Sequence, residues 1–281
     1  MRTRAFSFRI ALPAVLMAAA CCLLGPLTAA EPSYLPGKFV RADLVTDQTD
    51  AARDFYRGLF GWKFRGNSDY LVASNRGRPV AGLIKKSRPS SKAKATPRWF
   101  AYLSTTDVDR AAKSVKDGGG RVIIPPADLE GRGRQAVLAD PEGALFGIIH
   151  SSAGDPPDTE AKIGDWVWIQ FLSRNSGKAA NFYSKVGGYQ IRKDAASGHS
   201  DYILSSAGRA RATVRSIPSN KSKVQPTWLP FVRVKSIGDS VAKAKQLGGQ
   251  VVVSPRPELM EGRVAVVADP SGAAIGLMET K

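Results

Sequence analysis

The sequence predicts an α+β fold built from four β-α-β-β-β units, two in each half of the chain. Two repeats support this prediction. The stretch 50–62 returns as 177–189 with its Phe-Tyr pair kept, and the Asp-Pro-x-Gly stretch 140–143 returns as 269–272. Repetition at nearly constant spacing indicates a duplicated chain. Because each unit runs from strand to helix to three more strands, we expect mostly antiparallel, curved sheets.

The first unit begins with a strand over 39–45 and a helix over 50–60. Apolar residues at helical spacing mark one face of that helix, and Gly61 follows where a left-handed cap is common. The strands expected after it, separated by glycine and asparagine turns, are 62–64, 70–73 and 80–84.

The later units repeat this order. The second has a strand at 99–103, a helix at 107–117 and strands at 121–124, 135–139 and 145–149. In the second half, the strands 166–172 and 228–232 and the helix 240–247 match their counterparts. We therefore predict one domain over 36–150, a linker over 151–162 and a second domain over 163–279.

The first thirty residues are typical of a secretory signal peptide. Three arginines precede the apolar run 10–24, and the small residues 28–30 offer a cleavage site before Glu31. We expect an exported protein, periplasmic or extracellular. Lipoprotein processing at Cys21 is less favoured because the preceding alanines match that signal weakly. Both cysteines lie in this leader, so the mature chain should hold no disulfide and no transmembrane segment.

The net charge of +17 is unevenly distributed. The stretches 76–98 and 209–223 are rich in lysine and arginine and contain no acidic residue. Such stretches are usually solvated, but they also favour an anionic partner such as an envelope polymer. Export and the lack of a recognised motif make nucleic acid the least favoured partner.

The helices that carry Phe55-Tyr56 and Phe182-Tyr183, the double glycines after the second helices and the Asp-Pro-x-Gly turns together resemble the vicinal-oxygen-chelate superfamily. This superfamily includes glyoxalase I, bleomycin-resistance proteins and extradiol dioxygenases. The resemblance covers about 36–150 and 163–278. It implies two tandem glyoxalase-like domains, whose two halves we expect to pair within one chain.

The resemblance also implies a divalent metal held by His, Glu or Gln. The matching positions carry none of these residues: Val40 or Ala42, Val167 or Ile169, the stretches 80–84 and 212–214, Ala101, Leu229, Gly147 and Gly276. We therefore expect no metal and no cofactor. Asp43 and Gln170 lie one residue out of register and should face away from the cleft; in the opposite register they become the best polar pair. His150 and His199 are isolated.

These observations favour a metal-free module that binds a small polar or anionic organic molecule. Its cleft would be lined by Ala42, Gly147, Ile169 and Gly276. We expect no enzymatic activity from this residue set. One alternative is a metal-dependent lyase or dioxygenase of the glyoxalase type. The other is a basic interaction protein that holds an anionic envelope polymer through its loops.

Overall fold

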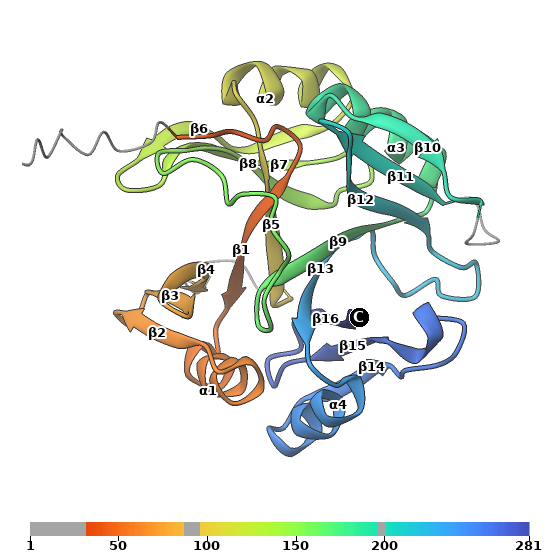
Figure 1. Ribbon diagram of the computed structural model, residues 1–281. Coiled ribbons are helices and arrows are strands. Elements are labelled where there is room, and N and C mark those ends of the chain that lie inside the picture. Colours follow the sequence, from red (N-terminus) through yellow and green to blue (C-terminus); the bar gives the residue numbers. More distant parts are fainter. Residues whose placement is uncertain (1–31, 87–95, 196–200, 281) are drawn as a thin grey trace, which may run out of the picture. The chain divides into compact units, whose positions relative to one another are not determined.

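Two eight-stranded sheets and four α-helices make up the fold of the computed structural model, which describes residues 32–86, 96–195 and 201–280 (Figure 1). The predicted leader, His199 and part of the basic stretch 76–98 lie outside the described residues. Among the described residues, no helix combines the length and the apolar character needed to cross a membrane.

The first sheet contains both units of the first half, in the order β2-β3-β4-β1-β5-β8-β7-β6. Its strands are β1 (Phe39–Thr46), β2 (Lys63–Gly66), β3 (Tyr70–Asn75), β4 (Arg78–Lys85), β5 (Arg98–Ser104), β6 (Arg121–Leu129), β7 (Gly133–Ala139) and β8 (Leu145–Ser151). The two units meet at the antiparallel pair β1–β5, whereas β1–β4 and β5–β8 are parallel. Strand β6 runs farther than predicted, through two prolines, which an edge strand tolerates.

The second sheet repeats this order as β10-β11-β12-β9-β13-β16-β15-β14. Its strands are β9 (Trp166–Ser173), β10 (Gln190–Lys193), β11 (Tyr202–Ser206), β12 (Arg209–Ser216), β13 (Thr227–Val234), β14 (Gln250–Val253), β15 (Val264–Ala268) and β16 (Ala274–Glu279). Most neighbouring pairs are antiparallel, so the predicted class of four β-α-β-β-β units is confirmed.

Each unit contributes one helix that follows its first strand. The helices are α1 (Thr49–Phe60), α2 (Val108–Asp117), α3 (Ser176–Gly187) and α4 (Ile237–Gln246). Gly61 ends α1 in the predicted left-handed conformation, with φ of 72°. Asp107 caps α2 by accepting a hydrogen bond from the backbone of Arg110, which satisfies a free amide of the first turn.

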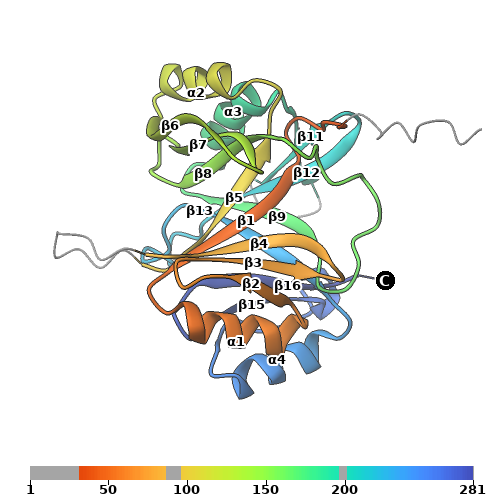
Figure 2. The ribbon, with the colours of Figure 1, turned by 90° about the vertical axis from the view of Figure 1, so that its left-hand side faces the viewer.

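The helices pack in pairs that cross between the halves of the chain: α1 lies against α4, and α2 against α3 (Figures 1 and 2). Each apolar core accordingly draws on both halves. One core joins the second unit to the third, and the other joins the first to the fourth. The prediction that the halves pair within one chain is therefore confirmed.

The Phe-Tyr helices and the Asp-Pro-x-Gly turns contact each other where the two halves of the chain pack together. The hydroxyl of Tyr56 on α1 donates to Asp269 Oδ2 of the second half at 3.0 Å, and Trp99 Nε1 donates to Tyr56 at 3.0 Å. Tyr183 on α3 makes the corresponding bond to Asp140 of the first half, also at 3.0 Å. Each Asp-Pro-x-Gly turn thus holds the helix of the opposite half.

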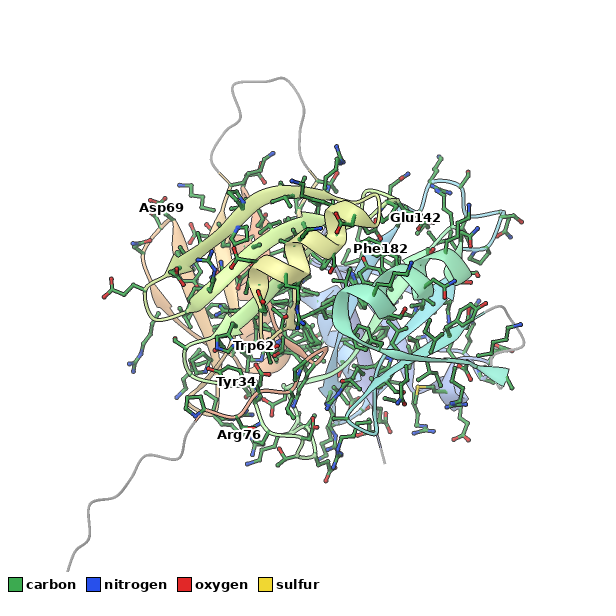
Figure 3. All side chains as sticks on the ribbon, turned by 90° about the horizontal axis from the view of Figure 1, so that it is seen from above. Tyr34, Trp62, Asp69, Arg76, Glu142 and Phe182 are labelled. Atoms are coloured by element: carbon green, nitrogen blue, oxygen red, sulfur yellow. The ribbon has the colours of Figure 1, made fainter. Side chains whose placement is uncertain are left out.

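A second contact fixes α3 against the first half. Glu142 accepts hydrogen bonds from the backbone amides of Arg174 and Asn175, just before α3. On α3 itself, Phe182 lies 3.0 Å from the point where a Cβ on Gly118 would stand, so α2 and α3 approach closely at that glycine. Figure 3 shows Glu142 and Phe182 in this region.

Candidate functional site

The central strand β1 alternates between the apolar core and the sheet face that turns away from the helices, here called the open face. Ala42 and Leu44 belong to the core beneath α1 and α4. Asp43, fully buried, lines a pocket on the open face. The expectation that Asp43 faces away from the cleft is therefore wrong. Apolar residues at both parities of 39–45 made that register ambiguous.

Two arginines bind the Asp43 carboxylate. Arg132 Nη2 donates to Oδ2 at 2.7 Å and Arg41 Nη2 donates to Oδ1 at 3.0 Å. Both arginines also approach the hydroxyl of Tyr70, at 3.3 and 3.2 Å. Burial lowers the pKa of Arg132, but the charge of Asp43, its hydrogen bond to Arg132 and the two nearby tyrosines together outweigh burial and raise that pKa. The cluster therefore holds two cations against one anion.

Tyr102 covers the middle of the open face. Its ring lies across Gly147 on the neighbouring strand β8, and a Cβ on that glycine would stand 2.2 Å from the ring. The guanidinium of Arg132 lies 5.4 Å from the ring centroid, within cation–π range. Burial, followed by the charge of Asp43, raises the pKa of the Tyr102 hydroxyl, so this group stays protonated at neutral pH.

Asp43, Tyr102 and Arg132 form the floor of a cavity of about 400 Å³, here called the first-half pocket. Apart from Asp43, Tyr102, Arg132 and Gln135, its lining is apolar: Val45, Ile84, Phe100, Ile123, Ile124, Ala127, Leu129, Ala136, Val137 and Leu145. At the rim, Ile123, Ile124 and Leu129 are exposed by 46%, 54% and 43%. An apolar cavity of this size with a few converging polar groups is the usual form of a small-molecule site.

Some polar atoms of the pocket have no hydrogen-bond partner among the described residues. These are the buried Oε1 of Gln135 and the buried Nε of Arg132. A buried polar atom without a partner costs about 1–3 kcal/mol. The pocket floor therefore offers one acceptor, on Gln135, and one donor, on Arg132, to a bound molecule.

The second half carries a different open face. Leu229, Phe231, Val266 and Met278 form an apolar cluster there, and Phe231 lies across Gly276 as Tyr102 lies across Gly147. Ile169, predicted with Gly276 to line the cleft, is buried in the core beneath α2 and α3 and also lines a separate cavity of about 730 Å³. Of the four predicted cleft residues, Ala42 and Ile169 thus face helices and both glycines lie beneath aromatic rings.

The residues of neither open face fit the divalent metal that the resemblance implies. In the first half, Asp43 is already bound by two guanidinium groups, which would repel a further cation. In the second half, the corresponding surface is the apolar cluster. Within 32–86, 96–195 and 201–280 no group of three His, Cys, Asp or Glu side chains could hold a metal ion.

The remaining polar candidates lie apart from this pocket. His150 stacks on Tyr34 with ring centroids 4.1 Å apart, and its Nδ1 lies 3.2 Å from the carbonyl of Thr105. Gln170 lies on β9 at the position that corresponds to Asp43, but in the other sheet, paired with Leu229 and Thr213. Asp43 and Gln170 therefore line no common pocket.

Sequence reasoning missed Arg132, Tyr102 and Gln135. Arg132 stands between two glycines of positive φ, in a β-turn that gave no sign of a partner 89 residues away. A usable signal was Asp43 itself, because an acidic residue inside a short buried strand needs a cation nearby.

The fold defines a class: tandem proteins in which two β-α-β-β-β units form each eight-stranded sheet. The sequence matches the model of the Glyoxalase/Bleomycin resistance protein/Dioxygenase superfamily over residues 38–148 and 167–277. The chain belongs to this superfamily, and the resemblance noted in the sequence is confirmed.

Two curated proteins and one solved structure are similar to this chain over most of its length. The anthracycline biosynthesis protein DauV of Streptomyces sp. (strain C5) is 29% identical over 263 residues, which span 88% of this chain and 95% of that protein. CFP32 of Mycobacterium tuberculosis (strain CDC 1551 / Oshkosh) is 29% identical over 84% of this chain and 92% of that protein. The Mn(II)-bound glyoxalase from Novosphingobium aromaticivorans shares the fold, with a TM-score of 0.59 and 16% identity over 87% of this chain and 82% of that one.

Proposed function

We propose that this chain binds a small organic molecule with a planar apolar body and an anionic oxygen group in the first-half pocket, without metal-dependent chemistry. The observation that carries this proposal is the floor of the pocket. There Arg132 lies beside Asp43, whose charge is also balanced by Arg41 next to the pocket, so the cluster keeps one positive charge in excess. Gln135 presents a buried acceptor that has no partner among the described residues.

The shape and lining of the pocket support an aromatic ligand. A cavity of about 400 Å³ holds a molecule of two or three fused rings, and its exposed rim isoleucines would lose water contact on binding. The name of the relative DauV refers to anthracyclines, which are planar polycyclic compounds bearing hydroxyl groups. A hydroxyl beside the anionic group would satisfy Gln135.

The test is isothermal titration calorimetry with 1-hydroxy-2-naphthoate. Arg132→Gln should weaken binding about tenfold or more, because a charged hydrogen bond is lost. Arg134→Gln, two residues along and paired with Asp109 and Asp128 outside the pocket, is the matched control and should leave binding unchanged. Equal losses in both variants would leave only general charge attraction.

A variant at the rim separates folding from binding. Ile124 is exposed in the free protein, so Ile124→Ser should weaken the naphthoate several-fold without lowering the melting temperature. If this variant binds as well as the parent chain, the apolar walls do not contact the probe.

We also propose that the chain is exported, on the leader described in the sequence. N-terminal sequencing of the protein recovered outside the cytoplasm should begin at Glu31. The envelope-polymer alternative depends on the basic stretches, and it predicts retention on an anionic polysaccharide column that disappears at moderate salt.

A further inference from the structure

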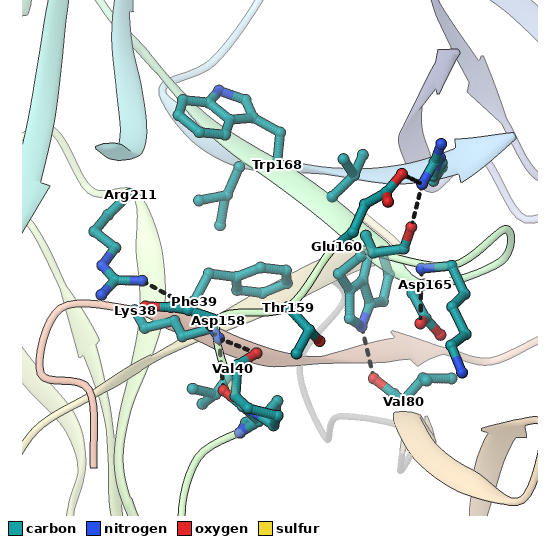
Figure 4. A pocket seen from close by; sticks show the side chains of 18 of the residues that line it. Lys38, Phe39, Val40, Val80, Asp158, Thr159, Glu160, Asp165, Trp168 and Arg211 are labelled. Atoms are coloured by element: carbon teal, nitrogen blue, oxygen red, sulfur yellow. Dashed lines mark hydrogen bonds and ion pairs between the residues drawn. The ribbon is translucent and has the colours of Figure 1, made fainter. Parts of the chain in front are cut away.

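A larger cavity lies where the two halves of the chain meet, here called the junction pocket. Its volume is about 730 Å³, and it is separate from the first-half pocket, with which it shares no lining residue. Strands β1 and β4 supply one side, β9 and β12 the other, and the linker residues 156–162 border both. Figure 4 shows this pocket, including Lys38, Arg211 and the linker residue Asp158.

One carboxylate of the linker forms ion pairs with three basic side chains beside this cavity. Asp158 lies 2.7 Å from Arg211 Nη1, 2.9 Å from Lys38 Nζ and 3.5 Å from Arg209 Nε. Lys38 also donates to the carbonyls of Pro156 and Pro157. The three cations exceed the single carboxylate, so this end of the cavity has an excess of positive charge.

One nitrogen of the Arg211 guanidinium has no hydrogen-bond partner among the described residues. Its side chain is only 5% exposed, its Nε donates to Ser206 and its Nη1 donates to Asp158. Its Nη2 is buried and has no partner among the described residues. A buried guanidinium nitrogen without an acceptor is costly. Since Arg211 lines the cavity, an acceptor brought there by a ligand would remove that cost.

Aromatic side chains supply the apolar part of the same cavity. Phe39 on β1 and Trp166 and Trp168 on β9 line it together with Val167. Both indole N–H groups are already used, by the carbonyl of Val80 at 2.7 Å and by Thr213 Oγ1 at 3.1 Å. The tryptophans therefore offer ring surface rather than hydrogen bonds, which suits an apolar body.

We propose that the junction pocket is a second binding site, which takes a small organic carboxylate whose oxygen accepts from Arg211 Nη2 and whose apolar body lies against Phe39 and Trp168. The site exists only in the paired protein, because β1 and β4 of the first half and β9 and β12 of the second both line it. It does not depend on the ligand proposed for the first-half pocket.

Tryptophan signals can test this site separately. Trp166 and Trp168 line the junction pocket, whereas no tryptophan lines the first-half pocket. In the full chain labelled with [15N]Trp, benzoate should shift the indole resonances of Trp166 and Trp168 in a saturable way. The buried indoles of Trp62 and Trp228 should stay in place and show that the fold is intact.

Two arginine variants complete the test. Arg211→Gln should weaken benzoate about tenfold or more, since the charged hydrogen bond is lost. Arg209→Gln removes the same charge beside the same carboxylate, but from a side chain that is 63% exposed and does not line the cavity. It should change the affinity less than about threefold. Neutral benzamide lacks the carboxylate. Its affinity for the parent chain should therefore be no higher than the affinity of benzoate for Arg211→Gln.

Three results would overturn the proposal. They are the absence of a saturable shift with benzoate, equal losses in the two arginine variants, and equal binding of benzamide. The first would remove the site, the second would reduce it to general attraction by surface charge, and the third would remove the role of the carboxylate. None of them bears on naphthoate binding in the first-half pocket.

Discussion

Gly147→Ala tests whether Tyr102 forms the floor of the first-half pocket. The new methyl group would stand 2.2 Å from Tyr102 Cδ1, well inside the 3.4 Å at which ordinary contact begins. The ring therefore has to move by more than about 1 Å, away from the sheet and toward the cavity. Gly276→Ala is its matched control, because there the methyl group would stand 2.1 Å from Phe231 Cδ1.

Both substitutions overpack a buried face, which costs about 1–3 kcal/mol of unfolding free energy. For a chain of this size that corresponds to a fall in melting temperature of about 2–12 °C. Only Gly147→Ala changes the binding site, so it alone should weaken 1-hydroxy-2-naphthoate, by about tenfold. Differential scanning calorimetry gives the stability change, and titration calorimetry gives the affinity.

The comparison between the two glycines decides the result. If both variants lose affinity equally, the loss follows from destabilisation and Tyr102 has no particular role. If Gly147→Ala melts lower but binds the probe as well as the parent chain, the probe does not occupy the first-half pocket.

Two further predictions concern the contacts that join the halves. Tyr56→Phe leaves the buried groups of Trp99 and Asp269 without their shared partner, so the unfolding free energy should fall by about 2–4 kcal/mol in urea titrations; a fall below about 0.5 kcal/mol would contradict this. The hydrogen bond from Arg211 lowers the pKa of Asp158 from 3.8 to about 2. A depressed carboxyl pKa stabilises the fold above about pH 4, and that contribution disappears as the pH falls toward 2. The gap in melting temperature between the parent chain and Asp158→Asn should therefore close over that range; a constant gap would show that the ion pair adds nothing.

Much of the fold could be predicted because its signals are local. Gly61 ends a helix and Asp107 begins one through contacts within a few residues. The pairing of α1 with α4 rather than α2 has no local signal. It depends on which apolar face each helix buries, and both choices satisfy the same periodicity.

The candidate site could be predicted only in part. Reasoning from the metal-ligand positions placed Ala42 in the cleft, although Asp43 faces it, because strand 39–45 reads as amphipathic in either register. One partner of Asp43 is Arg132, which a sequence pattern does not reveal, since the two meet only when β1 and the turn between β6 and β7 come together on one sheet face. The excess of arginine was visible, but not the carboxylate that each one binds.

The crossed pairing of helices has a consequence for dividing this chain. A cut in the linker would leave two fragments, and each would hold one helix of either pair and expose the apolar side of both of its helices. Neither fragment could bury those apolar faces alone, so each would aggregate or bind the other fragment. Each half therefore needs the other to bury its helices. Co-expressed as separate polypeptides, the two halves should assemble into one complex and act as a split protein.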